Sequence, residues 1–282
     1  MDLRRRFVFR GNAAAIGGRI VRPNDFIIDP GIASSLTTVG GRSQSKGGSK
    51  SFGDFVSYGA VETLAEGLFD KLEQHVELTH KWTGEDQLTT TTRVHADVKD
   101  LSVGRKPKLT VKRLHAALLS RSPGGSGEPA IAAGAETVIE NAAIDGHGLV
   151  IDLATDVFQK CDTRSKLLTA VDDPAFVKAS GDCFFLKPPA AGAPAPSLGR
   201  LLHACGTIHA TIVRSIRWAR DPYPGATIDH NSITVPDFGK IFFGELIITD
   251  LSRRLTLMRL ELGSPDGGTV AATDVESTGI WS

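Results

Sequence analysis

Hydrophobic and polar residues alternate along several segments, as in a strand with one buried face. Leu88–Val98 and Leu109–Leu119 show this alternation, and Thr207–Val213 is β-branched at five of its seven positions. Lys240–Thr249 is almost continuously apolar, as expected of a strand covered on both faces, and Leu255–Leu262 follows within hairpin distance. These five segments predict β-strands, some of them joined as antiparallel hairpins.

Helical spacing is confined to two segments. Apolar residues recur at every third or fourth position of Tyr58–Leu78, which predicts a helix with one apolar face, although Gly67 weakens it. Asp162–Val171 is a shorter candidate with Asp162 or Thr163 as its N-cap. The strand–helix alternation of a doubly wound fold is missing. We therefore predict a mainly β fold, an antiparallel sandwich or barrel with one or two helices; the alternative is an α+β fold.

Two segments rich in turn-forming residues interrupt this pattern. Gly40–Ser51 combines glycine, serine and cationic residues, which predicts a Gly/Ser surface loop at 40–51. Lys187–Ser197 contains four prolines, which favour an extended connection at 187–197. We predict a single β-rich domain over residues 1–282, and the alternative is two subdomains, 1–186 and 198–282.

Charge and cysteine content limit the partners and the compartment. The 32 Lys and Arg residues balance the 32 Asp and Glu residues, so we expect neither nucleic acid nor a membrane as partner. Three cysteines without a CxxC pair are typical of free thiols in a reducing compartment. Arg10 and Asn12 interrupt the apolar stretch that a twin-arginine export signal requires, so export by that route is not expected. The predicted location is the cytoplasm.

The densest group of reactive side chains consists of His203, Cys205 and His209. On an extended strand these three residues share one face, and thiolate and imidazole ligands favour zinc. Their spacing differs from the established zinc patterns, and a cysteine beside small residues is often simply buried in a core. The sequence therefore predicts a candidate zinc site, with three structural residues as the alternative.

Two short segments place a carboxylate beside an imidazole. They contain Asp145 with His147, and Asp229 with His230. Such a pair can orient a general base, although both segments also have the composition of ordinary exposed turns. If the two turns meet in space, the four side chains form a catalytic acid–base site.

Other catalytic motifs are missing, and three classes of function remain. The sequence has neither a GxSxG nor an HExxH motif, and Lys46 and Lys50 in the glycine-rich segment could hold a phosphate without the Walker A order. We favour a small-ligand-binding or self-assembling module, whose partner is a small molecule or a second copy of the chain. The alternatives are a hydrolase or lyase that uses the His and Asp residues, with or without a bound metal, and a structural subunit of a larger particle.

Overall fold

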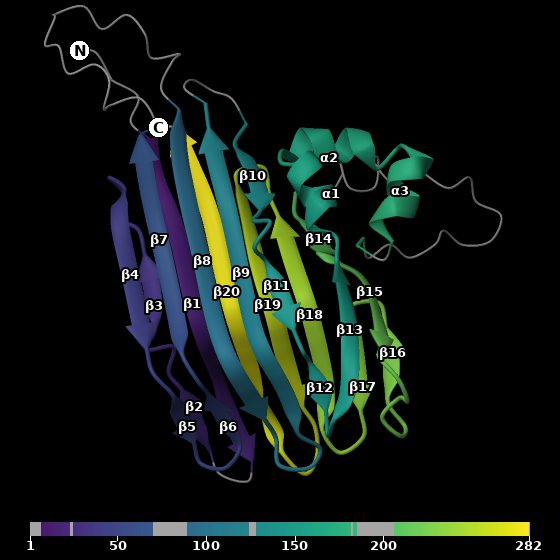
Figure 1. Ribbon diagram of the computed structural model, residues 1–282. Helices are drawn as coiled ribbons and strands as arrows, with labels where there is room; N and C mark the ends of the chain where they lie inside the picture. Colours follow the sequence, from purple (N-terminus) through teal and green to yellow (C-terminus); the bar gives the residue numbers. More distant parts are fainter. Residues whose placement is uncertain are drawn as a thin grey trace, which may run out of the picture.

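The computed structural model describes residues 7–22, 25–69, 89–123, 128–181, 183–184 and 206–281. They form two antiparallel sheets and three short helices (Figure 1). The nine strands of the first sheet are β1 (Phe7–Arg22), β2 (Phe26–Ile28), β3 (Ala33–Ser35), β14 (Ile208–Thr211), β16 (Thr227–Asp229), β17 (Ser232–Val235), β18 (Gly239–Ile248), β19 (Ser252–Leu262) and β20 (Gly267–Trp281). The eleven strands of the second sheet are β4 (Gly41–Gly47), β5 (Lys50–Phe52), β6 (Val56–Tyr58), β7 (Val61–Phe69), β8 (Thr90–Val103), β9 (Leu109–Ser122), β10 (Ala130–Ala133), β11 (Val138–Glu140), β12 (Ala143–Ile144), β13 (His147–Leu153) and β15 (Val213–Trp218). The helices are α1 (Thr155–Lys160), α2 (Arg164–Ala170) and α3 (Pro174–Ser180).

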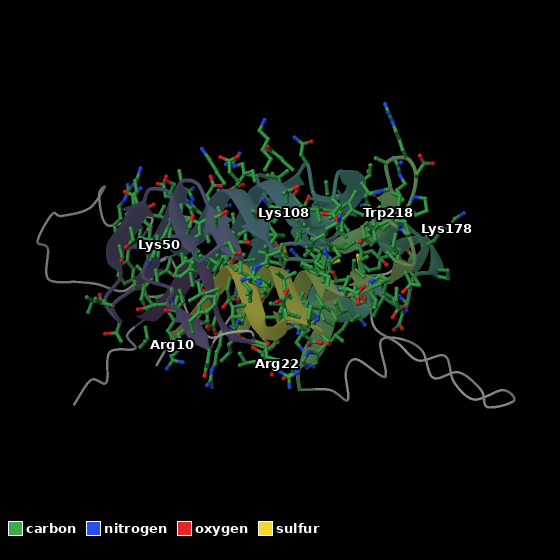
Figure 2. All side chains as sticks on the ribbon, turned by 90° about the horizontal axis from the view of Figure 1, so that it is seen from below. Arg10, Arg22, Lys50, Lys108, Lys178 and Trp218 are labelled. Carbon is green, nitrogen blue, oxygen red and sulfur yellow. The ribbon has the colours of Figure 1, made fainter. Side chains whose placement is uncertain are left out.

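The two sheets pack face to face as a sandwich. Strands β8 and β9 of the second sheet lie against β1, β19 and β20 of the first. Figure 2 shows the two layers with side chains between them, Lys50 and Lys108 in one layer and Arg10 and Arg22 in the other. Alternate residues of the facing strands, such as Val94 and Val270, are fully buried there. This burial of apolar side chains drives the association of the sheets, and it confirms the predicted mainly β fold.

The first sheet joins segments from both ends of the chain. Its strand order is β16–β17–β18–β19–β20–β1–β2, with β14 beside β18 and β3 beside β1. Strand β1 pairs with β20 along its length, from Phe7 opposite Trp281 to Arg22 opposite Gly267. Residues before and after the proline-rich segment therefore share one sheet. Residues 187–197 themselves lie outside the described ranges, and the domain division stays a prediction.

The helix predicted over 58–78 is wrong for the residues that the structure describes. Strands β6 and β7 occupy 56–58 and 61–69, whereas residues 70–78 lie outside the described part of the chain. Strand β7 buries Val61, Ala65 and Gly67 on one face, but Leu64 and Leu68 lie on the other face. Its apolar residues therefore match a helical spacing. Gly67 is needed in this strand because a Cβ there would lie 2.6 Å from Cδ1 of Phe9.

The loop predicted at 40–51 is also wrong. Its residues form strands β4 and β5, and β4 pairs with β7 from Gly41 opposite Gly67 to Gly47 opposite Val61. The composition indicated a loop because β4 is a polar strand at the side of the sheet, where charged residues are common. Two ion pairs to β7 hold it: the cations of Arg42 and Lys46 lie 3.5 and 3.2 Å from acidic side chains.

The three helices follow one another at one end of the sandwich (Figure 1). The predicted helix at 162–171 is confirmed as α2, and the Thr163 side chain accepts a hydrogen bond from the backbone N–H of Lys166 (3.1 Å). Pro174 begins α3 rather than disturbing α2, because proline fits the first turn of a helix. The described residues thus contain three helices rather than one or two. None of these helices has the length and apolarity to span a membrane.

Candidate functional site

The β8–β9 hairpin carries ionisable side chains on its outer face. Its pairing places Asp97 directly opposite His115, and His95 opposite Ala117. Along β8, Val94, Ala96 and Val98 are buried in the core, and the residues between them point to the other face. His95, Asp97 and His115 therefore lie together on the outside of the sandwich.

Asp97 is the centre of a polar cluster. Arg113 donates to both carboxylate oxygens, with Nη2 3.0 Å and Nε 3.1 Å from its nearest oxygens, and Nδ1 of His115 lies 3.6 Å from Oδ2. Burial alone would raise the pKa of Asp97, but the side chains of His115 and Arg113 lower it to about 2. The carboxylate is therefore ionised at neutral pH, and it orients the side chains of Arg113 and His115.

The two imidazoles are adjacent and differ in environment. His115 is only 8% exposed, and its ring centroid lies 5.3 Å from that of His95. Burial and the nearby His115 lower the pKa of His95, against the opposing effect of neighbouring carboxylates. At neutral pH His95 is therefore a neutral imidazole. Because Nδ1 of His115 faces Asp97 and Arg113, Nε2 is the nitrogen of that ring which a ligand can reach.

A hollow of about 700 Å³ adjoins this cluster, and we call it the histidine hollow. It is lined by Leu64, Arg93, His95, Arg113, His115, Leu118, Leu119, Ala132, Ala133, Gly134, Ala135, Glu136 and Gln159. The lining thus combines an apolar wall from β9 and β10 with ionisable side chains from β8 and β9, the carboxylate of Glu136 between β10 and β11, and the amide of Gln159 from α1. Arg93 is exposed, and it makes no ion pair with any residue in the described ranges.

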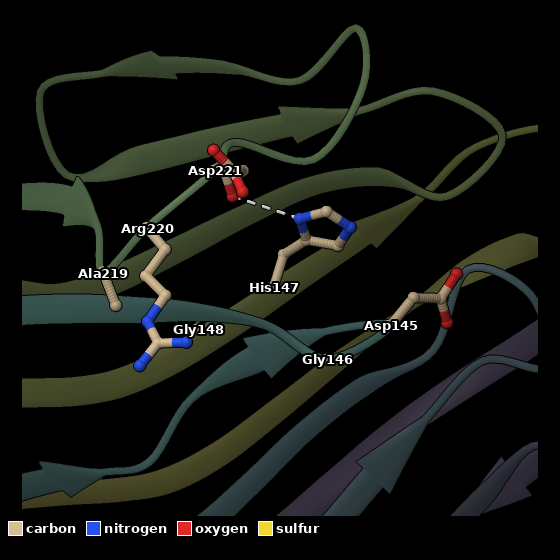
Figure 3. Close-up of a pocket in the computed structure, with 7 residues that line it drawn as sticks. All are labelled: Asp145, Gly146, His147, Gly148, Ala219, Arg220 and Asp221. Carbon is tan, nitrogen blue, oxygen red and sulfur yellow. Dashed lines mark hydrogen bonds between the residues drawn. The ribbon is translucent and has the colours of Figure 1, made fainter.

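The predicted residues Asp145 and His147 line a second, smaller hollow of about 500 Å³ (Figure 3). Asp145 and Gly146 have φ values of 46° and 85°, which fit a two-residue type I′ turn between β12 and β13. Nδ1 of His147 donates to the carbonyl oxygen of Asp221 (3.1 Å), so Nε2 is the basic nitrogen of this ring. Asp145 Oδ1 accepts from the backbone N–H of Lys108 (2.8 Å), which stabilises the neighbouring loop.

The second predicted turn is not part of this hollow. Asp229 and His230 lie in the hairpin between β16 and β17, in the other sheet, and they are absent from the lining of the His147 hollow. His230 has a φ of 49°, and its Nε2 lies 3.8 Å from Oδ1 of Asp229. Both side chains are exposed. The structure therefore shows each carboxylate–imidazole pair on its own turn, and a combined catalytic role of the four residues stays a prediction.

The remaining predicted ligands occupy separate places. His209 is exposed on β14, whereas His203 and Cys205 lie outside the described residues, so the zinc site stays a prediction. Within the described ranges, no group of three or more His, Cys, Asp or Glu side chains is arranged to hold a metal. Lys46 pairs with Glu62 (3.2 Å), and the Lys50 ammonium lies 4.7 Å from the centre of the Phe52 ring. The proposed phosphate site at these lysines stays a prediction too.

The histidine hollow was missed by sequence reasoning, although part of its signal is in the pattern. Assigning Val94, Ala96 and Val98 to the buried face of a strand sends His95 and Asp97 to the opposite face. A hairpin turn between Val103 and Leu109 then fixes the register, in which Asp97 faces His115. The residues of the far wall, including Gln159, come from a distant part of the chain that no local pattern connects.

Comparison with known protein families gives one match, and it covers the histidine hollow. A family described as a domain of unknown function (DUF8256) matches residues 7–181, which is well over half of the chain and includes every residue that lines the histidine hollow. No curated protein and no solved structure matches the chain. On the extent of that match, the chain belongs to the DUF8256 family.

Proposed function

We propose that this protein binds a small organic anion in the histidine hollow. The observation that carries the proposal is the position of Arg93, an arginine without an ion pair in the described chain, beside two imidazoles and an apolar wall. Binding sites for small molecules typically combine such a wall with a few convergent polar groups in a volume of this size. The proposal makes the chain a ligand-binding module.

The lining predicts how the anion would be held. Arg93 offers a planar guanidinium that matches a carboxylate or phosphate, because its N–H groups can bond two oxygens at once. Arg113 bonds Asp97 through both Nε and Nη2, so it serves as a support rather than as the primary anion contact. The apolar body of the ligand would lie along Leu118 and Leu119.

The experiment compares an anion with its neutral counterpart. Isothermal titration of the full chain with benzoate and with benzyl alcohol measures how much of the binding depends on the charge. We expect one benzoate per chain, bound more tightly than benzyl alcohol. Arg93→Gln should weaken benzoate binding about tenfold, since a hydrogen bond to a charged group is worth about 1.5 kcal/mol or more.

Arg121→Gln is the matched control, because Arg121 is also exposed on this hairpin but does not line the hollow. It should bind benzoate as the unmodified protein does. Equal benzoate affinity in the two variants, or equal affinity for benzoate and benzyl alcohol, would contradict the proposal. Phenyl phosphate, titrated in parallel, shows whether the site prefers a carboxylate or a phosphate.

A second candidate function uses the same hollow for acid–base catalysis. It is favoured by one observation: a neutral imidazole lies beside an imidazole that is held by a carboxylate. Two ionisable groups in different environments are the usual basis for a general base and a general acid. Hydrolysis of p-nitrophenyl acetate by the protein, and its loss in His95→Gln but not in Arg93→Gln, would support a hydrolase; equal rates in both variants would not.

A further inference from the structure

A different hollow lies where the two sheets end on the same side of the sandwich. Strands β2 and β5 are the last members of their sheets in the strand order, and both lie at the lower left of Figure 1. Ile20, Phe26 and Ile27 come from the first sheet, Phe52 ends β5 of the second sheet, and Phe55 lies in the turn between β5 and β6. They line a space of about 360 Å³, which we call the phenylalanine hollow.

Its wall is mainly apolar. Ile20 and Phe55 are 0% and 4% exposed and form the floor, whereas Phe26 and Phe52 are half-buried at the sides. Ile27 stands at the rim and is 70% exposed. An exposed aliphatic side chain beside aromatic walls leaves apolar surface in water that an apolar ligand would cover.

Arg105, at the mouth of the hollow, is bonded to a carboxylate through one nitrogen only. Arg105 lines the hollow and lies 2.8 Å from Oδ1 of Asp54, and both side chains are exposed. The Lys50 ammonium lies over the Phe52 ring, 4.7 Å from its centre. Nη1 and Nε of Arg105 bond no residue in the described ranges, so they remain for a second carboxylate.

We propose that the phenylalanine hollow binds a medium-chain fatty acid anion, with its acyl chain between the three aromatic rings and its carboxylate on Arg105. The apolar wall favours the chain, and the N–H groups of Arg105 that Asp54 leaves open favour an anionic head over a neutral one. At about 30 Å³ for each water-sized group, the hollow accommodates about twelve such groups. Decanoate has about that size. This site is separate from the histidine hollow and does not depend on the function proposed there.

The first test is the dependence of affinity on chain length. Isothermal titration of the full chain with hexanoate, octanoate, decanoate and dodecanoate gives four dissociation constants. We expect Kd to fall up to about fourfold for each added methylene, the factor for fully burying one such group. The fall should end near decanoate, where the hollow is filled. Affinities that do not change from hexanoate to decanoate, or binding that does not saturate, would overturn the proposal.

The second test places a charge at the rim. Ile27→Glu should weaken decanoate binding at least tenfold, because it introduces a carboxylate where the acyl chain enters. Val39→Glu is the matched control: Val39 is 80% exposed and does not line the hollow, so its variant should bind decanoate normally. Because both positions are largely exposed, both variants should fold, and their thermal unfolding confirms it. Equal affinity in the two variants would refute the site.

The third test identifies the residue that binds the carboxylate and distinguishes the fatty acid from other occupants of the hollow. Arg105→Gln should weaken decanoate binding several-fold and leave decanol binding unchanged, whereas Arg93→Gln in the histidine hollow should change neither. Loss of decanoate binding in Arg93→Gln alone would assign the fatty acid to the other hollow and overturn the proposal. Light scattering of the unmodified protein and of Ile27→Glu tests the remaining occupant: a dimer that dissociates in the variant would show that a second copy covers the hollow.

Discussion

The Asp97→Asn substitution should make the free energy of unfolding much less sensitive to low pH. The ordinary pKa of an aspartate, 3.8, falls to about 2 for Asp97 in the folded protein. That difference corresponds to about 2 kcal/mol of folding free energy. The contribution is fully present above about pH 5 and is lost as the pH falls through 3.8 to about 2, because the unfolded state binds the proton first. An asparagine has no such proton to bind.

The measurement is urea denaturation of the two proteins at pH 7 and at pH 3. At pH 7 the variant should be less stable by about 2 kcal/mol, equivalent to roughly 3–4 °C in Tm for a chain of 282 residues. At pH 3 the difference should shrink to about half. Asp100→Asn is the control, since Asp100 is exposed on the same strand and its φ of 52° suits asparagine equally. A difference between Asp97→Asn and the unmodified protein that is the same at both pH values would refute the reasoning.

Three further substitutions test a close contact between strands, a buried hydrogen bond and a helix cap. Gly18→Ala should cost about 1–3 kcal/mol in urea denaturation, because its Cβ would lie 2.3 Å from a backbone carbonyl oxygen of β20, whereas Gly31→Ala, with no atom within 4 Å, should be tolerated. Arg253→Met should cost about 2–3 kcal/mol and speed amide exchange at the end of α1, because the buried guanidinium donates to the Cys161 carbonyl oxygen (2.6 Å). Thr163→Ala removes the N-cap of α2 and should lower the unfolding free energy by about 1 kcal/mol, which thermal unfolding would show as a small decrease in Tm.

The strands were predictable where their pattern differs from a helical spacing. The alternation in 88–98 and 109–119 corresponds to β8 and β9, and the apolar segments at 240–249 and 255–262 correspond to the β18–β19 hairpin. Strand β7 escaped prediction because Leu64 and Leu68 lie on its outer face, so its apolar residues do not show a period of two. Strand β4 escaped because its glycine and serine residues are stabilised by pairing with β7 and by ion pairs across the two strands, and neither can be read from composition.

The candidate site was also only partly predictable from the sequence. Asp145 and His147 were recognised because the turn brings them together locally, and the structure places them in one hollow. The cluster around Asp97 depends on a strand register, which becomes readable only once the β8–β9 hairpin is recognised. Its far wall depends on the packing of α1 and β10, which are distant in sequence from β8. Contacts of that range arise from the tertiary fold alone.

The pairing of β1 with β20 has a consequence for the synthesis of this protein on the ribosome. Roughly 250 residues separate the partners, and at about 5–20 residues per second their synthesis lasts roughly 12–50 s. Throughout this delay the N-terminal strand has one row of backbone N–H and C=O groups with no native neighbour. Until β20 has been synthesised, this edge of β1 is open to pairing with other chains, and aggregation is expected to begin there.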